Sequence, residues 1–414
     1  MDISPGLRRV PPPDLDSVAS DPVLVERIVA EIERDGPLTF ARFMELALYE
    51  PDHGYYRTSN ARPGRDGDFL TAPEANPIFG RALARHVVDA WQAVGAPPSF
   101  VIREHGAGSG SLALAILDGL AVEEPTLYRI VRYQAIDVEA RRLAELRQRL
   151  SGAGHGDRLQ ADDASPIVGA LIANEVLDAL PTHRVQGAIG FRAGDAGAGD
   201  AEGGDPALVE IFVGWRDGAF VDVSGAPSTA GLAGRLAEEG VALQAGQQAE
   251  ICLAVDGWVT HAAAGLERGV ALFIDYGYPA AELYDPLRRP AGTLAAYLGQ
   301  RAHGDPYRAV GRQDLTAHVD TTAVERAAGR AGLSHLATTT QARFLAGLGA
   351  GELLVELQSG PGASLQRYLE ARAALVRMID PAAMGGFRVL AFGRGVVADA
   401  PFRGLRRRGP GQLE

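Results

Sequence analysis

The stretch FVIREHGAGSGSLALAILDGLA, residues 100–121, decides the fold. It opens with a short apolar segment rich in aromatic and β-branched residues, which is typical of a buried strand. The glycine-rich loop EHGAGSG, residues 104–110, follows, and the apolar run after it is long enough for a buried helix. A strand, a tight turn and a helix in this order indicate the β-α unit of a parallel sheet.

The glycines of this loop indicate a ligand. Gly106, Gly108 and Gly110 permit positive φ and let the backbone approach a bound molecule, while free N–H groups at the helix start favour an anion. A dinucleotide fingerprint would need its third glycine at position 111, which is Ser111, so an NAD-dependent dehydrogenase is disfavoured. We predict that the loop binds S-adenosylmethionine (SAM), with the methionine carboxylate at the helix start and Glu104 among the cofactor contacts.

Three aspartates extend the predicted cofactor site. Asp137 ends the next strand, RYQAID, where a carboxylate can accept hydrogen bonds from the ribose hydroxyls of a nucleotide. Asp162 and Asp163 follow the helix EARRLAELRQRL, at the expected end of a third strand. One of this pair could contact the adenine amino group, and the alternative is a solvated loop.

Short apolar strands alternate with amphipathic helices over much of the chain. After RYQAID come the helix EARRLAELRQRL, the strands ALIANEV and VALFIDYG, and a last strand FRVLAFGRGV. This alternation predicts an α/β fold with a doubly wound sheet, the Rossmann-like architecture of class I methyltransferases.

Two additions to this sheet are expected. Between Asp21 and Tyr49 apolar residues recur at helical spacing, which predicts two helices before the core. A Gly/Ala/Asp-rich loop after Gly187 and the segments ALVEIFVGW and AFVDVSG, joined by Asp217-Gly218, predict a mobile loop and an inserted β-hairpin. The expected division is a flexible arm (1–20), an N-terminal helical extension (21–95), a SAM-binding domain (96–402) with an insertion around 187–250, and a flexible tail (403–414).

The strand ALIANEVLDALP, residues 170–181, ends in polar residues that are candidates for the methyl acceptor site. Ligands of open α/β sheets gather beyond the carboxyl ends of the strands, where Asn174, Glu175 and Asp178 are expected. A guanidinium acceptor is a planar cation whose preferred partner is a carboxylate, so Glu175 and Asp178 could hold it. The alternative is capping and solvation of the next helix. Asp275 ends another strand and is expected to hold a neighbouring loop.

Two further loops carry similar residues. In GDFLTAPE, residues 67–74, Thr71 and Glu74 precede a helix and could cap it. The segment GRQDLTAHVD, residues 311–320, is also expected to lead into a helix, and a structural role is favoured for His318 over that of a catalytic base.

Five of these motifs together resemble the MidA family of SAM-dependent methyltransferases. They are, in order, GDFLTAPE, EHGAGSG, ANEVLDALP, FIDYG and GRQDLTAHVD, and the resemblance extends to PLTFARFMELALYEPDHGYY and to the final MGGF segment. The mitochondrial members of that family are complex I assembly factors that symmetrically dimethylate an arginine of a complex I core subunit.

The resemblance implies roles for individual residues of this chain. It implies cofactor contacts at the three loop glycines and an acceptor site lined by Asn174, Glu175 and the GDFLTAPE loop. From that loop, Thr71 and Pro73 are assigned to the cofactor and Glu74 to the acceptor. The family loop reads closer to Glu-Leu-Gly-Pro-Gly-x-Gly, so His105 and Ala107 depart from it, but the glycines that make the turn remain.

The composition narrows the possible functions. The chain has 414 residues, of which 46% are hydrophobic, and no apolar run approaches the 18 or so residues of a membrane-spanning helix. A single cysteine, Cys252, excludes an intramolecular disulfide, and the histidines lack the spacing of metal ligands. The net charge of -12 disfavours nucleic acid as a partner. We therefore expect a cytoplasmic protein with no metal and no membrane association.

The predicted function is methyl transfer from SAM to an arginine of a partner protein. One alternative is a SAM-binding assembly scaffold without transfer activity. Another is a small-molecule N- or O-methyltransferase, because this fold accepts many acceptors through changes in its loops. The helices before the core could also form a homodimer surface.

Overall fold

The computed structural model describes residues 18–58, 71–161, 163–188, 208–299, 301–359, 363–396 and 401–406. The predicted arm and tail lie mostly outside these ranges, as do the Gly/Ala/Asp-rich loop from residue 189 onward and Asp162. Within the described residues, none of the helices combines the length and the apolar character that a membrane crossing requires.

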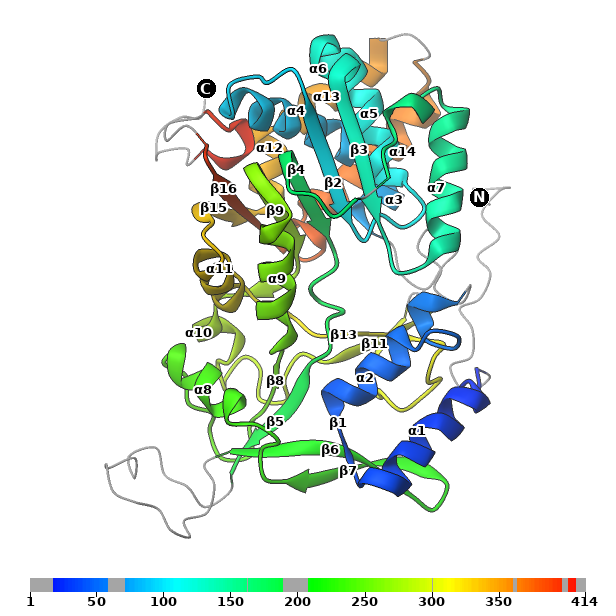
Figure 1. The fold of residues 1–414 in the computed structure, drawn as a ribbon, viewed down its shortest axis with the longest axis vertical. Coiled ribbons are helices and arrows are strands. Elements are labelled where there is room, and N and C mark those ends of the chain that lie inside the picture. The colour runs from blue at the N-terminus through cyan, green and yellow to red at the C-terminus, as the bar shows by residue number, and fades with distance from the viewer. Residues whose placement is uncertain are drawn as a thin grey trace, which may run out of the picture.

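A six-stranded sheet forms the centre of the upper half of the molecule (Figure 1). Four neighbouring strands are parallel, and two antiparallel pairings extend the sheet at one edge. The chain leaves the central strand β2 first towards β3 and later towards β4, so a switch point lies between β2 and β4. This confirms the predicted doubly wound sheet. In spatial order the strands are β15 (Ser334–Thr340), β16 (Arg388–Arg394), β9 (Leu266–Asp275), β4 (Ile167–Asn174), β2 (Phe100–His105) and β3 (Val131–Ile136).

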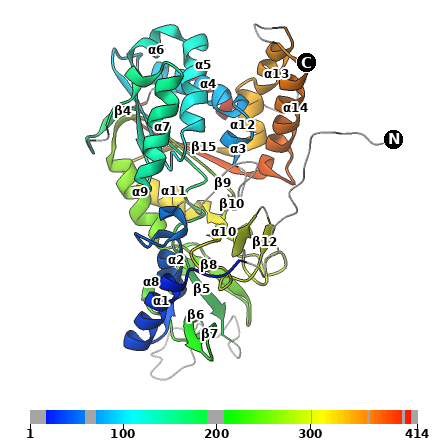
Figure 2. The same ribbon diagram turned by 90° about the vertical axis from the view of Figure 1, so that its right-hand side faces the viewer.

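Helices cover both faces of this sheet (Figure 2). One face is packed by α4 (Ile78–Ala93) and α5 (Ser111–Glu123), and the other by α9 (Ala254–Ala264) and α11 (Thr321–Arg330). The remaining α-helices of this half are α3 (Ala72–Ala75), α6 (Pro125–Ile130), α7 (Ala140–Gly152), α12 (Gln341–Gly347), α13 (Ala350–Ser359) and α14 (Leu365–Ile379).

Helix α4 belongs to the core of the sheet, although the sequence places it in the N-terminal extension. It shares one hydrophobic core with α5 and with the central strands. Small residues bring the two helices together, since a Cβ at Gly80 would lie 2.5 Å from Cβ of Ala115 and one at Gly119 would lie 2.6 Å from Cβ of Ala84. The N-terminal extension therefore ends before Ile78.

A second, five-stranded sheet forms the lower half with helices α1 (Pro22–Asp35) and α2 (Phe40–Tyr49) (Figure 1). The predicted hairpin is present, and Asp217 and Gly218 turn its corner with positive φ values of 51° and 79°. It is only part of this sheet, which the N-terminal segment completes through β1. The strands are β1 (Leu38–Thr39), β5 (His183–Gly187), β6 (Leu208–Arg216), β7 (Ala219–Gly225) and β8 (Gln248–Ile251).

Short strands connect the two halves. The segment GRQDLTAHVD leads into α11, as predicted, because Asp320 caps that helix by accepting the N–H groups of Thr322 and Ala323. It also forms strands, which the sequence did not predict. The connecting elements are α8 (Ala230–Glu238), β10 (Gly277–Tyr278), α10 (Ala280–Leu283), β11 (Ala295–Leu298), β12 (Arg301–His303), β13 (Asp314–Thr316) and β14 (Val319–Asp320).

The prediction of a third strand ending at Asp162-Asp163 is wrong. The described part of the segment after α7 contains a short 3-10 helix, Gly156–Arg158, and a single parallel bridge between Leu159 and Tyr133. The sequence RLQADDASP has too few apolar residues to be buried as a strand of the sheet.

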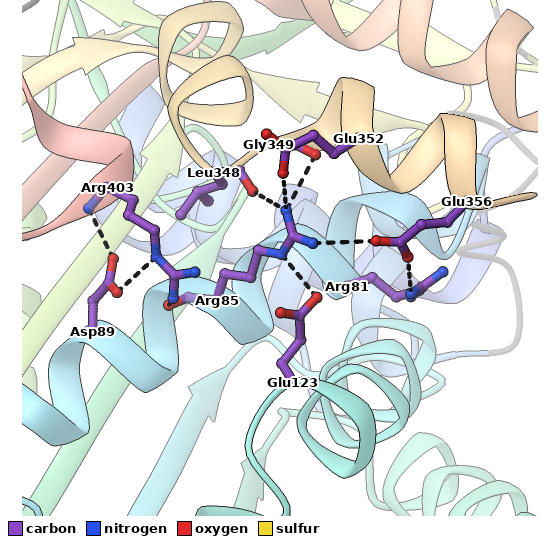
Figure 3. A network of polar contacts seen from close by, with 9 residues as sticks. All are labelled: Arg81, Arg85, Asp89, Glu123, Leu348, Gly349, Glu352, Glu356 and Arg403. Atoms are coloured by element: carbon purple, nitrogen blue, oxygen red, sulfur yellow. Dashed lines mark hydrogen bonds and ion pairs between the residues drawn. The ribbon is translucent and has the colours of Figure 1, made fainter.

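A buried arginine ties α4 to the C-terminal helices (Figure 3). The guanidinium of Arg85 donates to Glu123 at 2.8 Å, to the carbonyl oxygen of Leu348 at 3.0 Å and to Glu352 at 3.2 Å. One turn earlier on the same helix, Arg81 forms an ion pair with Glu356 at 3.1 Å, a residue that is half exposed.

We expect Arg85→Ala to lower the free energy of unfolding by about 3 kcal/mol, because it removes a buried guanidinium and leaves the partly buried carboxylate of Glu123 and the carbonyl oxygen of Leu348 without it. Arg81→Ala is the matched control and should cost less than about 1 kcal/mol, because its ion pair reaches solvent. Urea unfolding of the two variants measures the difference. Equal losses would contradict the role given to Arg85.

Candidate functional site

A cavity of about 500 Å³ opens at the carboxyl ends of β2, β3 and β4. One part, which we call the loop side, is lined by residues that follow β2 and β3. The other, the acceptor side, is lined by residues at and after the end of β4, by further residues of the upper half, and by residues from the lower half and from the strands that connect the halves. The loop side comprises Glu104–Gly108, Ser109, Ser111, Leu112, Ile136, Asp137, Val138 and Arg142, with Thr71, Pro73 and Glu74 beside it; the acceptor side comprises Tyr49, Tyr56, Asn174, Glu175, Val176, Asp178, Ala179, Trp258, Tyr276, Tyr297, Asp314, Thr316 and Phe387.

All three loop glycines have positive φ, but a side chain at each position would meet different surroundings. A Cβ at Gly106 would lie 2.6 Å from Cγ2 of Val176, and one at Gly110 would lie 2.6 Å from Cγ of Leu146. A Cβ at Gly108 would meet no atom within 4 Å, and this glycine faces the cavity. Gly110 is absent from the lining, and its close packing against Leu146 accounts for the lack of a side chain there. Its cofactor contact stays a prediction, since Gly110 is the N-cap residue at which α5 begins.

Two side chains hold this loop in place. The carboxylate of Asp137 accepts the N–H of Gly108 at 2.8 Å and that of Glu139 at 2.9 Å, at the mouth of the cavity. The hydroxyl of Ser109 donates to Glu74 at 2.9 Å, which joins the loop to helix α3 (Ala72–Ala75). The sequence allowed Glu74 a capping role, but its carboxylate reaches across to the glycine loop.

Glu104 is buried at the end of β2, and the hydroxyl of Tyr133 donates to its carboxylate at 2.7 Å. Burial raises the pKa of Glu104 to about 8, and the hydrogen bond from Tyr133 opposes that rise. Asp163, by contrast, is exposed, accepts the N–H of Ser165 and does not line the cavity. Asp163 therefore fits the alternative of a solvated loop, while Asp162, the other residue of the predicted pair, lies outside the described residues.

Glu175 occupies a strained backbone position on the acceptor side. Its φ is 54°, a backbone conformation that residues other than glycine rarely adopt. Its N–H donates to the carbonyl oxygen of Ile274 at 2.8 Å. Its carboxylate accepts from Nδ2 of Asn174 at 2.9 Å. Burial, and then the charge of Asp178, raise the pKa of Glu175 to about 8.

Asp275 fixes the turn that follows Glu175. One of its carboxylate oxygens accepts the N–H groups of Val176, Leu177 and Asp178, at 3.1, 2.9 and 3.2 Å. This confirms the expectation that Asp275 holds a neighbouring loop. Burial, and then the charges of Asp178 and Glu175, raise its pKa well above the usual range.

Asp178 is buried beside this turn, and the hydroxyl of Tyr276 donates to its Oδ2. Burial raises the pKa of Asp178 to about 6. Within the described part of the chain, Oδ1 of Asp178 and Oδ1 of Asn174 are buried without a hydrogen-bond partner. Buried polar atoms without partners are costly, and at the wall of a cavity they indicate groups that a ligand or a bound water can satisfy.

Sequence reasoning missed the aromatic wall of the acceptor side. The rings of Tyr49 and Tyr56 stack with centroids 5.6 Å apart. The hydroxyl of Tyr56 donates to Asp314 at 2.7 Å, and that of Tyr49 to the carbonyl oxygen of Ala179 at 2.9 Å. Tyr56 lies in the segment PDHGYY and Asp314 in GRQDLTAHVD. Both segments belong to the family resemblance, but the sequence did not predict that the two residues meet in the cavity.

The loop side fits the predicted cofactor. Gly108 leaves open space where any side chain would project, and α5 begins without a side-chain cap, so its first N–H groups can meet a carboxylate. Asp137 stands one strand away, as a ribose-binding acid must. No group of three or more His, Cys, Asp or Glu suited to a metal ion occurs among the described residues.

The strand order and this loop define a class I SAM-dependent methyltransferase. A family model described as "Putative S-adenosyl-L-methionine-dependent methyltransferase" matches residues 82–339. The chain therefore belongs to this family of SAM-dependent methyltransferases, and SAM is its cofactor.

Solved structures and curated relatives agree with this assignment. The crystal structure of a "likely methyl transferase" from Burkholderia thailandensis, bound to S-adenosyl-homocysteine, has a TM-score of 0.80 and 35% identity over 92% of this chain and 94% of that one. A native crystal structure of a protein from the same bacterium has a TM-score of 0.77 and 34% identity, covering 93% and 94%. The mitochondrial protein arginine methyltransferase NDUFAF7 homolog of Drosophila melanogaster is 27% identical over 91% of this chain and 86% of its own length.

We expect Gly108→Val to weaken SAM binding by about two orders of magnitude, about 3 kcal/mol. The new side chain would project into the part of the cavity where the cofactor is expected to bind. Gly95→Val is the matched control: Gly95 also has positive φ (85°) and no atom within 4 Å of a Cβ, but it precedes β2, at the other edge of the sheet. Calorimetric titration with SAM gives both affinities. Near-normal affinity in Gly108→Val would refute the placement of the cofactor.

Proposed function

We propose that this methyltransferase transfers methyl groups from SAM to arginine side chains of a partner protein. The observation that carries the proposal is the acceptor side of the cavity, where Glu175, Asp178 and Asp314 line one space with four tyrosines. The curated relatives from Drosophila melanogaster and Xenopus tropicalis are named protein arginine methyltransferases, which supports the same acceptor class here.

The charges of the acceptor side favour a cation. Glu175 and Asp178 have raised pKa values, to about 8 and about 6, because burial disfavours their charged forms. A positively charged acceptor would compensate both carboxylates, and a guanidinium can bind them through paired N–H groups. The tyrosine rings can also stack on a guanidinium plane. A neutral acceptor does not compensate the charge of the carboxylates, and an anionic acceptor is repelled by them.

The protein contributes orientation and charge control to the reaction. When bound, SAM supplies an electrophilic methyl group on a positively charged sulfur. Glu175 and Asp178 hold the guanidinium plane and favour electron density on the nitrogen that faces the cofactor. One of these carboxylates takes the proton that the nitrogen loses after transfer, and Tyr276 keeps Asp178 in place through its hydroxyl.

Labelling tests the acceptor class. The protein is incubated with tritiated SAM and a total lysate, the products are separated on a denaturing gel, and the labelled band is examined by mass spectrometry. Methylated arginine in a protein band that disappears with Glu175→Gln supports the proposal. Label that leaves the gel with small molecules would indicate a small-molecule methyltransferase and contradict it, and so would label on another residue type.

The pH profile of kcat/KM should report Glu175. Its pKa of about 8 means that it is protonated at pH 6, so kcat/KM for the labelled acceptor protein should rise, by up to about tenfold per unit, towards a plateau above pH 8. Glu175→Gln should lower the plateau about a hundredfold and abolish the rise between pH 7 and 8.

Glu267→Gln is the control for this measurement, because Glu267 is exposed at the opposite end of β9. Its profile should match that of the unaltered protein. A flat profile in the unaltered protein, or an unchanged rise in Glu175→Gln, would argue against this role of Glu175.

A further inference from the structure

A second, much smaller cavity lies directly behind the acceptor side. Its volume is about 20 Å³, and Asp178 lines both cavities. The walls of the small cavity include Thr182, which follows β4, and His318, which lies between β13 and β14. His318 is the histidine of the motif GRQDLTAHVD. It has no role in the proposed reaction as described above.

In the described parts of the chain, four residues that line this cavity hold a polar atom that is buried without a partner. The atoms are Oδ2 of Asp320 and, on the three residues considered first, Oδ1 of Asp178, Oγ1 of Thr182 and Nδ1 of His318. Thr182 is 1% exposed and Oδ1 of Asp178 is buried, so bulk water does not reach these two groups. Three such atoms around one small cavity require a common explanation.

Other polar groups on the walls have partners of their own. The carboxylate of Glu250 accepts from the N–H and the hydroxyl of Thr293, at 2.6 and 2.9 Å. The hydroxyl of Tyr284 donates to the carbonyl oxygen of Glu250 at 3.3 Å, and the thiol of Cys252 to that of Pro181 at 3.5 Å. Apart from Asp320, the lack of partners is therefore concentrated on Asp178, Thr182 and His318.

Asp320 also lines this cavity, but its carboxylate oxygens have other neighbours. One of its oxygens caps α11, and the other lies within reach of the carboxyl group of Glu239. Burial, and then hydrogen bonding with Asp320, raise the pKa of Glu239 to about 8.

The size of the cavity and the chemistry of its walls match one water molecule. A buried water needs roughly 10–15 Å³ of such space and makes about three hydrogen bonds. Burial, and then the charge of Arg289, lower the pKa of His318 to about 4, so its ring is neutral near pH 7 and Nδ1 can accept or donate. A water can donate to Asp178, exchange a hydrogen bond with Thr182 and pair with His318.

We propose that one water molecule binds in this cavity to Asp178, Thr182 and His318, and that His318 and Thr182 are thereby positioning residues for the Asp178 carboxylate. Tyr276 holds Oδ2 of that carboxylate, and the water holds Oδ1. With both oxygens fixed, the carboxylate presents one orientation to the acceptor. The inference rests on the proposed function, because only there does Asp178 meet the acceptor.

His318 has a second possible role, in ring packing. Its ring lies edge-on to Tyr276, with centroids 5.3 Å apart at 79°, and stacks on Tyr278 at 5.6 Å and 29°. Two substitutions separate the roles: His318→Phe keeps a ring and removes Nδ1, whereas His318→Asn removes the ring and keeps a polar atom close to the position of Nδ1.

The rate of methyl transfer to the labelled acceptor protein, measured with tritiated SAM, distinguishes the two variants. We expect His318→Phe to lower kcat about tenfold with KM for SAM unchanged, and His318→Asn to keep kcat within about twofold of the unaltered protein. If His318→Asn is no more active than His318→Phe, the water-mediated role is overturned.

High-resolution crystal structures of the unaltered protein and of His318→Phe test the water itself, independently of any acceptor. A single water bonded to Asp178 and His318 in the first, and absent from the second, supports the inference. An empty cavity in the unaltered protein, or a water that does not contact His318, overturns it. If no acceptor protein is labelled, the arginine assignment fails, while these structures still decide whether the water is present.

Discussion

The carboxylate of Asp275 accepts three successive backbone N–H groups, and the arrangement of the acceptor side depends on it. These hydrogen bonds fix the turn from Val176 to Asp178 beyond the end of β4, which in turn holds Glu175 at positive φ. Without them the buried N–H groups would lack partners and the strained residue could relax. The same turn brings Val176 against Gly106, so the acceptor side and the cofactor loop are positioned together.

The two halves of the molecule supply different parts of the site. The loops after the strands of the six-stranded sheet provide the glycine loop, Asp137, and the carboxylates of Glu175 and Asp178. The lower half provides Tyr49 and Tyr56, and the connecting strands provide Asp314. Because β1 pairs with β6, the N-terminal segment and the insertion form one layer, which closes the cavity over the sheet. The loop side of the cavity is therefore built by the upper half, whereas the acceptor side combines residues of both halves.

Local sequence patterns were sufficient for the sheet and for most of the loop side. The order of strands and helices, the hairpin at Asp217-Gly218 and the role of Asp275 followed from periodicity and turn chemistry. Three features required long-range contacts that no local pattern contains: the pairing of β1 with β6, the packing of Gly110 against Leu146, and the meeting of Tyr56 with Asp314. Asp163 was misplaced because a polar segment was assumed to complete a strand.

The central claim is that one cavity holds the cofactor at the glycine loop and opens its reactive end towards Glu175 and Asp178. A crystal structure of this protein with S-adenosyl-homocysteine tests it most directly. The account predicts the homocysteine carboxylate at the start of α5, the ribose hydroxyls at Asp137, and the sulfur facing the acceptor carboxylates. A ligand bound elsewhere, or a sulfur turned away from those carboxylates, would contradict it.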